Sequence, residues 1–348
     1  MARGPRGAPA LGLGGGHHPE AAVVSGDAVR VSVLRRGTAS PSEELRAGLV
    51  AKDFSPWPKY FYDERGSALF EEITRQPEYY QTRTELSILR ERAGDILRRT
   101  GSRELVELGS GSASKTRVLI EAMLSHDGGP VRYVPLDVSE SALRASGTRL
   151  SKEYPGLEVR GYVGDFHASL GDLLAEPASG ERLILFLGGT VGNFTPERRR
   201  VFLSKLRAGM EAGDHLLLGV DLVKDPDVIE AAYDDAAGVT ARFNRNLLHV
   251  VNRHLGTDLD PHRFEHRAFY DAEESRVEMW LDARMEQGVW VGEEELVHFE
   301  AGEGMRTEIS AKFSPHSVEE VLREAGLSLV ELYTDGRGYF ALALAGVG

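Results

Sequence analysis

The segment Met305–Phe313, MRTEISAKF, has the alternation of a β-strand and carries side chains that could bind a polar ligand. Successive side chains of a strand point to opposite faces. One face would therefore carry Thr307, Ile309, Ala311 and Phe313, and the other Arg306, Glu308, Ser310 and Lys312. An exposed edge with its charges in water is the simpler interpretation. The alternative is that Glu308 and Ser310 point into a pocket and bind a ligand that carries N–H groups.

A glycine-rich turn follows the first apolar run of an alternating strand–helix series. The segment VELGSGSASKT places Glu107, Gly109 and Gly111 where a strand turns into a helix. Glycine allows a ligand to approach the backbone closely. Ser114 occupies the position of the third glycine in a dinucleotide-binding fingerprint. This difference disfavours NAD and leaves room for a nucleoside that lacks a pyrophosphate.

Three further segments end predicted strands with residues suited to a nucleoside. Asp137 ends YVPLDV, where its carboxylate could accept both ribose hydroxyls or cap the next helix. Asp165 and Phe166 end VGDF, where the acid could accept from an adenine amino group and the ring could cover adenine. The turn GGTVGN at 188–193 ends the fourth strand. Ligands of open α/β sheets bind beyond the carboxyl ends of the strands, so the four segments together predict the S-adenosylmethionine (SAM) site of a Rossmann-type methyltransferase.

The order of elements predicts an α/β core with an inserted block. Strands and helices alternate from about Leu105 to Val223, which indicates a parallel sheet covered by helices. The run LILFLGG is apolar throughout, as expected of a strand buried on both faces. Residues 225–255 are predicted to be mostly helical, and 264–292 to form antiparallel strands. A helix with Ser317 and Glu320 as a capping box then leads into a hairpin with an Asp-Gly turn.

The amino-acid composition and net charge of the chain limit the classes of protein to which it could belong. The chain has 348 residues, no cysteine and a formal net charge of −13. The acidic balance argues against general binding of nucleic acid or an anionic membrane, and no apolar run approaches the roughly 20 residues of a membrane-spanning helix. The absence of cysteine fits a cytoplasmic protein. Residues 1–27 are rich in Gly, Pro and Ala, and we expect them to form a disordered tail.

Five segments resemble one family of methyltransferases. They are PKYFYDERGSALFEEITRQPEYYQTRTE, VELGSGSASKTR, LGGTVGNFTP, LVKDPDVIEAAYDDAAGVTARFNRN and RTEISAKF. Together they are similar to the histidine-specific, SAM-dependent Nα-methyltransferases of ergothioneine biosynthesis. The resemblance runs from about Leu45 to the C-terminus. PEYYQTRTE and YDDAAGVTARFNRN are not general methyltransferase motifs, so the resemblance is specific.

The resemblance implies a fold, a reaction and a division into domains. The fold would be α/β, a Rossmann-type class I SAM-dependent methyltransferase with a second, α+β substrate-binding domain. The substrate-binding domain would comprise 28–83 and 222–312, and the methyltransferase domain 84–221 and 313–348. The enzyme would transfer three methyl groups from SAM to the α-amine of L-histidine, giving hercynine. By the same resemblance we expect a monomer that needs no metal.

The resemblance also implies roles for individual residues. The cofactor contacts would be Gly109, Lys115, Asp137, Asp165 and Phe166. The substrate carboxylate would be held by Asn193 and Tyr233. The imidazole pocket would comprise Tyr79, Met279, Glu308 and Ser310. The groups near the reacting amine would be Tyr62 and Gly188. On this interpretation the polar face of the segment MRTEISAKF is a pocket wall, whose carboxylate and hydroxyl could satisfy either a neutral or a charged imidazole.

Several alternatives remain open at this point. The substrate could be another amino acid or an indole amine, although Glu308 and Met279 favour histidine. The protein could instead bind SAM without turnover, or be a nicotinamide dehydrogenase, which Ser114 disfavours. His262 and His266 have a spacing that would suit a metal on a helix, but no third ligand is evident. Phe70 could favour a methylated cation through cation–π contact or simply pack in the core.

Overall fold

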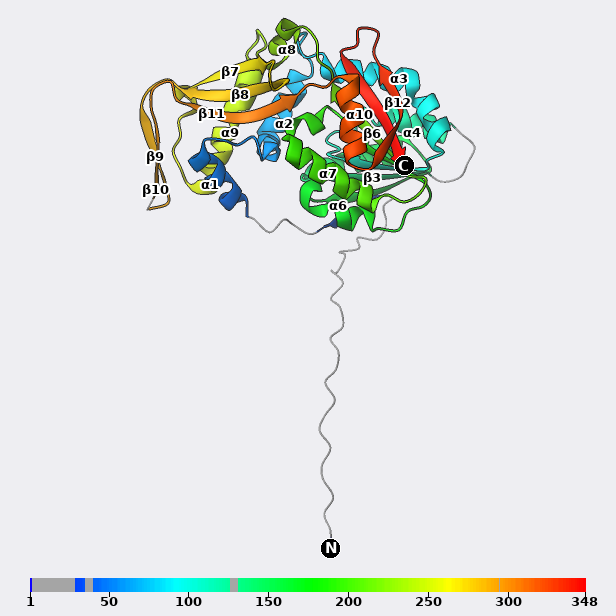
Figure 1. Cartoon of the computed structure of the whole chain (residues 1–348). Helices are drawn as coiled ribbons and strands as arrows, with labels where there is room; N and C mark the ends of the chain where they lie inside the picture. The colour runs from blue at the N-terminus through cyan, green and yellow to red at the C-terminus, as the bar shows by residue number, and fades with distance from the viewer. Residues whose placement is uncertain (2–28, 35–39, 126–130, 294) are drawn as a thin grey trace.

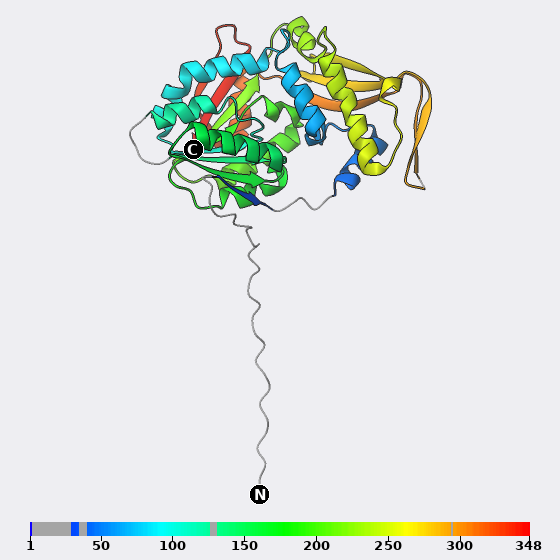
Figure 2. The ribbon, with the colours of Figure 1, turned by 180° about the vertical axis from the view of Figure 1, so that it is seen from behind.

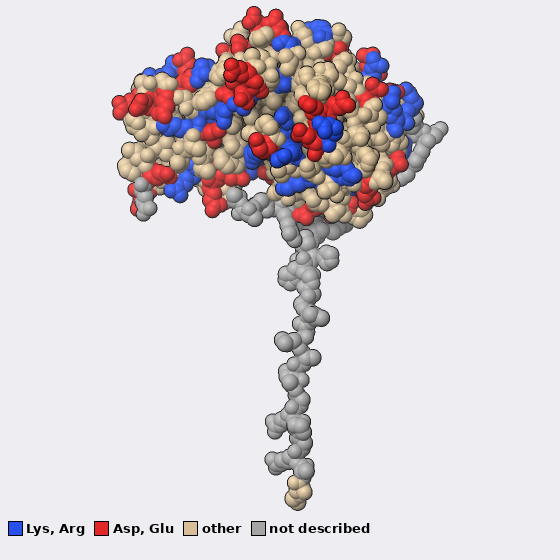
Figure 3. Space-filling model, viewed as in Figure 1, with Lys and Arg blue, Asp and Glu red and all other residues tan. Residues whose placement is uncertain are grey.

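The computed structural model describes residues 1, 29–34, 40–125, 131–293 and 295–348 (Figure 1). The predicted tail, residues 1–27, lies outside the described residues except for Met1. Acidic and basic side chains are interspersed over the face shown in Figure 3. None of the described helices is long and apolar enough to cross a membrane.

An eight-stranded sheet forms the larger part of the molecule, in the order β1-β4-β3-β2-β5-β6-β13-β12. Its strands are β1 (Val29–Val33), β2 (Glu104–Leu108), β3 (Val131–Asp137), β4 (Leu157–Val163), β5 (Arg182–Phe186), β6 (His215–Asp221), β12 (Leu327–Thr334) and β13 (Phe340–Val347). The first six strands of this order pair in parallel, whereas β13 is antiparallel to both β6 and β12. This order confirms the predicted Rossmann-type sheet that closes with an antiparallel hairpin.

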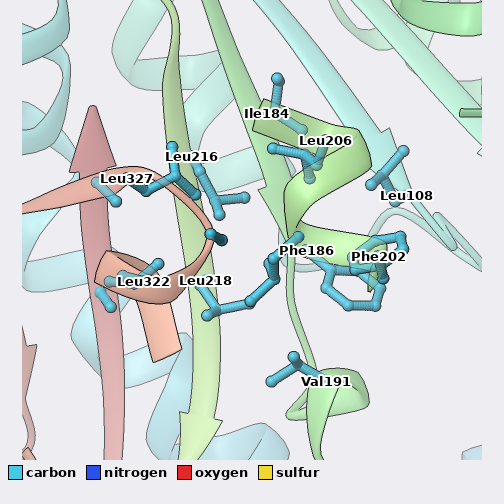
Figure 4. Close-up of a cluster of buried hydrophobic side chains, with 14 of the residues drawn as sticks. Leu108, Ile184, Phe186, Val191, Phe202, Leu206, Leu216, Leu218, Leu322 and Leu327 are labelled. Carbon is cyan, nitrogen blue, oxygen red and sulfur yellow. The ribbon is translucent and has the colours of Figure 1, made fainter. Parts of the chain in front are cut away.

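Helices cover both faces of this sheet (Figures 1 and 2). On one face lie α3 (Gln81–Thr100), α4 (Arg117–Leu124) and α5 (Glu140–Glu153), and on the other α6 (Phe166–Leu174), α7 (Pro196–Gly209) and α10 (Pro315–Glu324). The strand β5 is buried at every position, as its apolar sequence predicted. Phe186 of this strand packs against Phe202 and Leu206 of α7 (Figure 4). Their burial fixes the central strands whose carboxyl ends carry the candidate site.

A second, smaller sheet lies beside the first, with the antiparallel order β11-β8-β7. Its elements are β7 (Phe264–Asp271), β8 (Arg276–Ala283) and β11 (Gly304–Ala311), with the hairpin β9 (Gln287–Val291) and β10 (Glu295–Phe299) at the far end of the molecule in Figure 1. The helices around it are α1 (Pro41–Ala51), α2 (Glu64–Ile73), α8 (Pro226–Tyr233) and α9 (Val239–Leu255). The short 3-10 helices are η1 (Pro58–Phe61), η2 (Thr190–Asn193) and η3 (Pro261–Arg263).

The smaller sheet shares one hydrophobic core with two separated segments of the chain. Leu45 and Phe61 come from the N-terminal segment, and Phe243, Leu247 and Met279 come from the later one. In contrast, the strand β1, within the predicted segment 28–83, is the edge strand of the large sheet. The division of the chain into two functional domains stays a prediction.

A β-bulge in β11 corrects the predicted arrangement of its side chains. Arg306 pairs with Trp280 and Glu308 pairs with Met279, so Thr307 is an extra residue in the strand. Because Trp280 and Met279 are neighbours on β8, they lie on opposite faces, and so do Arg306 and Glu308. The prediction that Arg306 shares the face of Glu308 was therefore wrong. Strict alternation fails here because the bulge inserts one residue.

The two faces of β11 contact different residues. On the outer face Arg306 pairs with Asp53, at 2.6 Å between Nη2 and Oδ2. On the inner face Glu308 and Ser310 lie beside Met279 and Val277 of β8. That face packs against α9. The polar side chains of interest are thus buried inside the smaller half of the molecule, not exposed at an edge.

Two local predictions near the C-terminus need correction in detail. The helix α10 begins at Pro315 with Ser314 as its N-cap, and the capping box joins Ser314 to Ser317. Proline at the first helical position favours this earlier start, so the predicted pair of Ser317 and Glu320 is wrong. The predicted hairpin is present, but its connection runs from 335 to 339 and is longer than an Asp-Gly turn.

Gly189, in the turn after β5, has a backbone conformation that favours glycine. Its φ is +71°, in the left-handed region. An ideal Cβ would meet the Phe340 Cε2 at 3.6 Å, an ordinary van der Waals contact. Space for a side chain is therefore available, and only the backbone conformation disfavours one.

We expect Gly189→Ala to lower the free energy of unfolding by about 1 kcal/mol, because an L-residue is strained at this φ. The matched control is Gly171→Ala in α6, where the site is exposed and no heavy atom lies within 4 Å of an ideal Cβ. That change should raise the free energy of unfolding by about 0.5–1 kcal/mol. Denaturant unfolding measures both values, and a Gly189→Ala protein as stable as wild type would contradict the argument.

Candidate active site

The glycine-rich turn between β2 and α4 is tied to the end of β3. Gly109 has φ +77° and donates its N–H to the Leu136 carbonyl at 2.8 Å. Gly111, with φ +48°, donates its N–H to Asp137 Oδ2 at 2.8 Å. No heavy atom lies within 4 Å of an ideal Cβ at either glycine. The turn therefore presents open backbone beside a carboxylate, which fits the ribose and amino-acid parts of SAM.

The two predicted nucleoside-binding carboxylates lie at the ends of adjacent strands. Asp137 Oδ1 accepts from the Ser139 N–H at 2.9 Å, and Ser139 is itself the N-cap of α5. Asp165 is the N-cap of α6 and also accepts from Lys59 Nζ at 2.8 Å. Burial would raise the pKa of Asp165, but the Lys59 ammonium and the hydrogen bond from the His167 N–H together outweigh this effect and lower the pKa. Both groups are thus acceptors whose remaining lone pairs could bind hydroxyl or amino groups.

Phe166 follows Asp165 and is half-buried. Its ring contacts those of Phe186 and Phe202, with centroids 5.5 Å and 5.8 Å away. Core packing therefore accounts for part of its position, and its role as a cover for adenine stays a prediction.

One buried carboxylate joins the cofactor side to the predicted reaction centre. Glu85 of α3 is fully buried. It forms an ion pair with Lys115 and accepts the Gly188 N–H at 2.8 Å. Gly188 has φ +80°, so its backbone is held in a conformation that favours glycine. Glu85 was not among the predicted site residues, although it ends the segment PEYYQTRTE that carries the family resemblance.

Tyr62, predicted near the reacting amine, lies close to Tyr79 and Glu308, which were predicted to form the imidazole pocket. Burial raises the pKa of Tyr62 and of Tyr79, and the negative charge of Glu308 raises both further. Burial also raises the pKa of Glu308 to about 7, against the opposing effect of Lys312. Within the described residues, neither tyrosine hydroxyl nor the Glu308 carboxylate has a hydrogen-bonding partner. Glu308 is buried and the two tyrosines are half-buried. Because buried polar groups normally have partners, the carboxylate of Glu308 points to a bound polar ligand.

Ser310 and Tyr233, in contrast, are already bound to each other. Tyr233 ends α8 and donates its hydroxyl to Ser310 Oγ at 2.7 Å. The Lys312 ammonium donates to both oxygens, at 2.9 Å each. Lys312 also pairs with Asp221, the last residue of β6, at 2.9 Å. Neither Lys312 nor Asp221 was predicted as a site residue, although Lys312 was placed on the polar face of the strand.

Asn193 lies where the two sheets meet. It ends η2, and an ideal Cβ on the preceding residue, Gly192, would lie 2.8 Å from the Ala311 carbonyl oxygen and 3.5 Å from Ser310 Oγ. The turn after β5 therefore packs directly against β11. Tyr62 also interacts electrostatically with Asp137 of the cofactor side. The predicted cofactor and substrate residues thus lie in neighbouring parts of the molecule.

Two other residues considered in the sequence have structural partners. Phe70 contacts Tyr62 and Tyr79 edge-on, with ring centroids 5.5 Å and 6.0 Å apart, as core packing would produce. His266 lies in β7 and is buried, with Nε2 2.9 Å from the Tyr233 carbonyl oxygen, whereas His262 lies in η3. The pair is therefore not on one helix. Among the described residues, no group of three or more His, Asp or Glu side chains is placed to hold a metal.

Comparison with known proteins identifies the family. Residues 41–347 match a family described as histidine-specific, SAM-dependent methyltransferases. The chain is 51% identical over 304 residues to a histidine N-alpha-methyltransferase of Mycolicibacterium smegmatis, covering 87% of this chain and 93% of that protein. It is 46% identical over 323 residues to a histidine N-alpha-methyltransferase of Mycobacterium tuberculosis, covering 91% and 99%. The chain belongs to the histidine-specific methyltransferase family.

A more distant relative extends this comparison. Ergothioneine biosynthesis protein 1 of Schizosaccharomyces pombe is 30% identical over 282 residues, which cover 78% of this chain and 36% of that protein. The predicted family resemblance is confirmed by these similarities. The histidine-specific methyltransferase described here is accordingly a SAM-dependent N-methyltransferase with a small-molecule substrate. The roles of its individual residues remain predictions.

The raised pKa of Glu308 predicts a pH-dependent stability. Its pKa is about 7 in the folded protein, against about 4.3 in an unfolded chain. The native state therefore holds the proton more tightly, and this group makes stability fall as the pH rises from about 4.3 to about 7. We expect Glu308→Gln to raise the free energy of unfolding at pH 8 by roughly 2 kcal/mol, with little change at pH 4.

Denaturant unfolding at the two pH values tests this expectation. The control is Glu265→Gln, which changes an exposed carboxylate on the outer face of the same sheet. It should alter stability equally little at both pH values. A Glu308→Gln protein less stable than wild type at pH 8 would show that the carboxylate makes a stabilising contact when ionised.

Proposed function

We propose that this enzyme transfers three methyl groups from SAM to the α-amine of L-histidine. The product would be hercynine (Nα,Nα,Nα-trimethyl-L-histidine), in the first step of ergothioneine biosynthesis. The observation that carries the proposal is the buried, unpartnered carboxylate of Glu308 beside the hydroxyl of Ser310, in a member of a histidine-specific family. Few side chains other than imidazole offer two ring nitrogens that such a pair can bind.

We assign the imidazole to the inner face of β11. Glu308 would accept a ring N–H, and Ser310 would bind the other ring nitrogen. Met279, which pairs with Glu308 across the sheet and is buried, would contact the ring, as would Tyr79. An analogue without ring nitrogens would leave Glu308 buried and unpaired, at a cost of roughly 1–3 kcal/mol.

We assign the substrate carboxylate to Asn193 and Tyr233. The side chain of Asn193 has no hydrogen-bonding partner among the described residues, and the Tyr233 hydroxyl is held by Lys312. Both side chains can donate to a carboxylate. With the ring and the carboxylate fixed at two points, the α-amine can be directed to one position only, which is the condition for an efficient displacement.

The reacting amine would lie near Tyr62 and Gly188. SAM supplies a methyl group that its sulfonium already activates. The amine must be neutral to attack, so the protein mainly aligns the amine lone pair with the bond to be broken. Tyr62 would orient that lone pair and favour the growing cationic head through its ring. We assign no general base, and the proton that the nitrogen must lose before each attack passes to solvent.

We assign SAM to the carboxyl ends of β2, β3 and β4. Gly109 provides open backbone, Asp137 an acceptor for ribose and Asp165 an acceptor for adenine. Phe166 would cover adenine. Lys115, next to Gly188, would bind the cofactor near its carboxylate, as an ammonium can.

We also propose that the core shared by two chain segments is a substrate-binding domain, predicted as 28–83 and 222–312 but without the strand β1, which pairs in the large sheet. The methyltransferase domain would comprise 84–221 and 313–348. We expect a cytoplasmic monomer that binds neither nucleic acid nor membranes, which the net charge of −13 favours.

Incubation of the purified protein with SAM and single amines, followed by mass spectrometry, tests the function. The amines are L-histidine, tryptophan, tyrosine and histamine. We expect histidine to gain up to three methyl groups and histamine to remain unmodified, because histamine lacks the carboxylate. Methylation of tryptophan but not histidine would preserve the methyltransferase assignment and overturn the assignment of Glu308 and Ser310 to an imidazole.

Removal of the Glu308 carboxylate should impair histidine selectively. We expect Glu308→Ala to lower kcat/KM for histidine about 10- to 100-fold, because the ring N–H would lose its buried acceptor. Steady-state kinetics measures this change. The control, Glu265→Ala, removes a carboxylate from the outer face of the same sheet and should leave kcat/KM within about twofold. Equal values for Glu308→Ala and wild type would rule out the proposed ring contact.

A further inference from the structure

Lys312 is a fully buried cation whose donors are all used. Its ammonium donates to the Tyr233 hydroxyl and to Ser310 Oγ, each at 2.9 Å, and pairs with Asp221 Oδ2 at 2.9 Å. Its side chain is 0% exposed. An ammonium has three N–H donors, so each is matched by one oxygen. This geometry holds the ammonium directly behind two residues of the proposed histidine pocket.

Asp221 is shared between two lysines. It pairs with Lys312, and also with Lys224 at 2.6 Å between Nζ and Oδ1. The Tyr80 hydroxyl donates to the same carboxylate, at 2.9–3.0 Å. Two ammonium groups thus share one carboxylate, which leaves one positive charge in this buried network. Burial would lower the pKa of Lys312, but Asp221 and Tyr233 outweigh it and raise the pKa, so Lys312 stays charged.

The proposed carboxylate clamp has no charge of its own. Asn193 and Tyr233 are neutral donors, whereas a buried carboxylate is stable only beside a compensating charge or several hydrogen bonds. Lys312 supplies that compensating charge. Its ammonium donates to the Tyr233 hydroxyl, and this hydroxyl would in turn contact the ligand carboxylate. A donor bound to a cation is also polarised, and hydrogen bonds to charged groups are roughly twice as strong as neutral ones.

Binding would need only a rotation of one hydrogen. The Tyr233 hydroxyl donates to Ser310 in this structure. If it turned toward a ligand carboxylate, the Ser310 hydroxyl would still be able to donate to the ring nitrogen that Glu308 does not bind. Lys312 would keep both oxygens in place during this change, since it donates to each.

We propose that Lys312 is the positioning residue that makes the enzyme require a carboxylate on its substrate, by holding and polarising the Tyr233 hydroxyl. This inference rests on the proposed function, because it concerns the same histidine pocket. It assigns the preference for histidine over histamine to a residue that need not touch the substrate. It also assigns Asp221 the task of fixing the ammonium in place.

Isothermal titration calorimetry of histidine and histamine, with S-adenosylhomocysteine present, tests the inference. Binding can be measured even where turnover is lost. We expect Lys312→Met to weaken histidine binding at least 10-fold and to change histamine binding less than about threefold. A merely structural role for Lys312 would weaken both ligands equally, and this outcome would overturn the inference. Histidine binding at the wild-type level would overturn it as well.

Two further variants separate charge from folding. Lys224→Met removes the other lysine that pairs with Asp221 but makes no hydrogen bond to Tyr233 or Ser310. It should leave the ratio of the two dissociation constants within about threefold of wild type. Lys312→Gln keeps a hydrogen-bond donor at this position and removes the positive charge, so the preference for histidine should fall as in Lys312→Met. This variant keeps the proposal testable if Lys312→Met does not fold, because an unchanged preference in Lys312→Gln would contradict it.

The wild-type protein separates this inference from the proposed function. If neither ligand binds and histidine is not methylated, the proposed function fails. If histidine is methylated and the Lys312→Met protein retains the wild-type ratio of dissociation constants, the function stands and the role of Lys312 is refuted.

Discussion

The contact between the end of β6 and the end of β11 is the constraint on which the site depends. Phe313 donates its N–H to the Asp221 carbonyl, and Val223 donates to the Phe313 carbonyl, both at 2.8 Å. Beside these backbone bonds, the Asp221 carboxylate pairs with Lys312. This contact, where residues 221–223 run beside 312–313, therefore ties the large sheet to the small sheet. Glu308 and Ser310 lie only a few residues before it, so their position relative to the large sheet is fixed.

This junction places the predicted cofactor-binding residues near the predicted substrate-binding residues. The large sheet contributes the open glycine turn, Asp137 and Asp165, each at the carboxyl end of a parallel strand. The small sheet contributes Glu308 and the bound pair of Ser310 and Tyr233. A methyl transfer needs the donor sulfur and the acceptor nitrogen at a fixed separation and angle. A hydrogen-bonded connection between the two sheets meets that need.

Much of the fold could be predicted because it depends on local patterns. The apolar run of β5 and the alternation of strands and helices from Leu105 onward were sufficient for the large sheet. The bulge at Thr307 was not predictable, because it depends on pairing with β8 and not on the sequence of β11 alone. The start of α10 was also misplaced, since Ser314 and Ser317 offer similar capping chemistry.

The site was predictable only in part, for a similar reason. Position-by-position resemblance indicated residues such as Glu308 and Asn193, which the structure brings to one region. Glu85, Asp221 and Lys312 were missed because a buried charged residue is recognised by the residue it pairs with. In the pairs Glu85–Lys115 and Asp221–Lys312, the two partners are 30 or more residues apart in the sequence. No spacing rule relates such residues before the fold is known.

A crystal structure of the protein with L-histidine and S-adenosylhomocysteine would show directly where the substrate lies. We expect the imidazole between Glu308 and Ser310, the carboxylate within hydrogen-bonding distance of Asn193 and Tyr233, and the α-amine directed at the cofactor sulfur. A ring bound away from Glu308, or an amine directed away from the sulfur, would contradict the assignment of this strand face to the substrate.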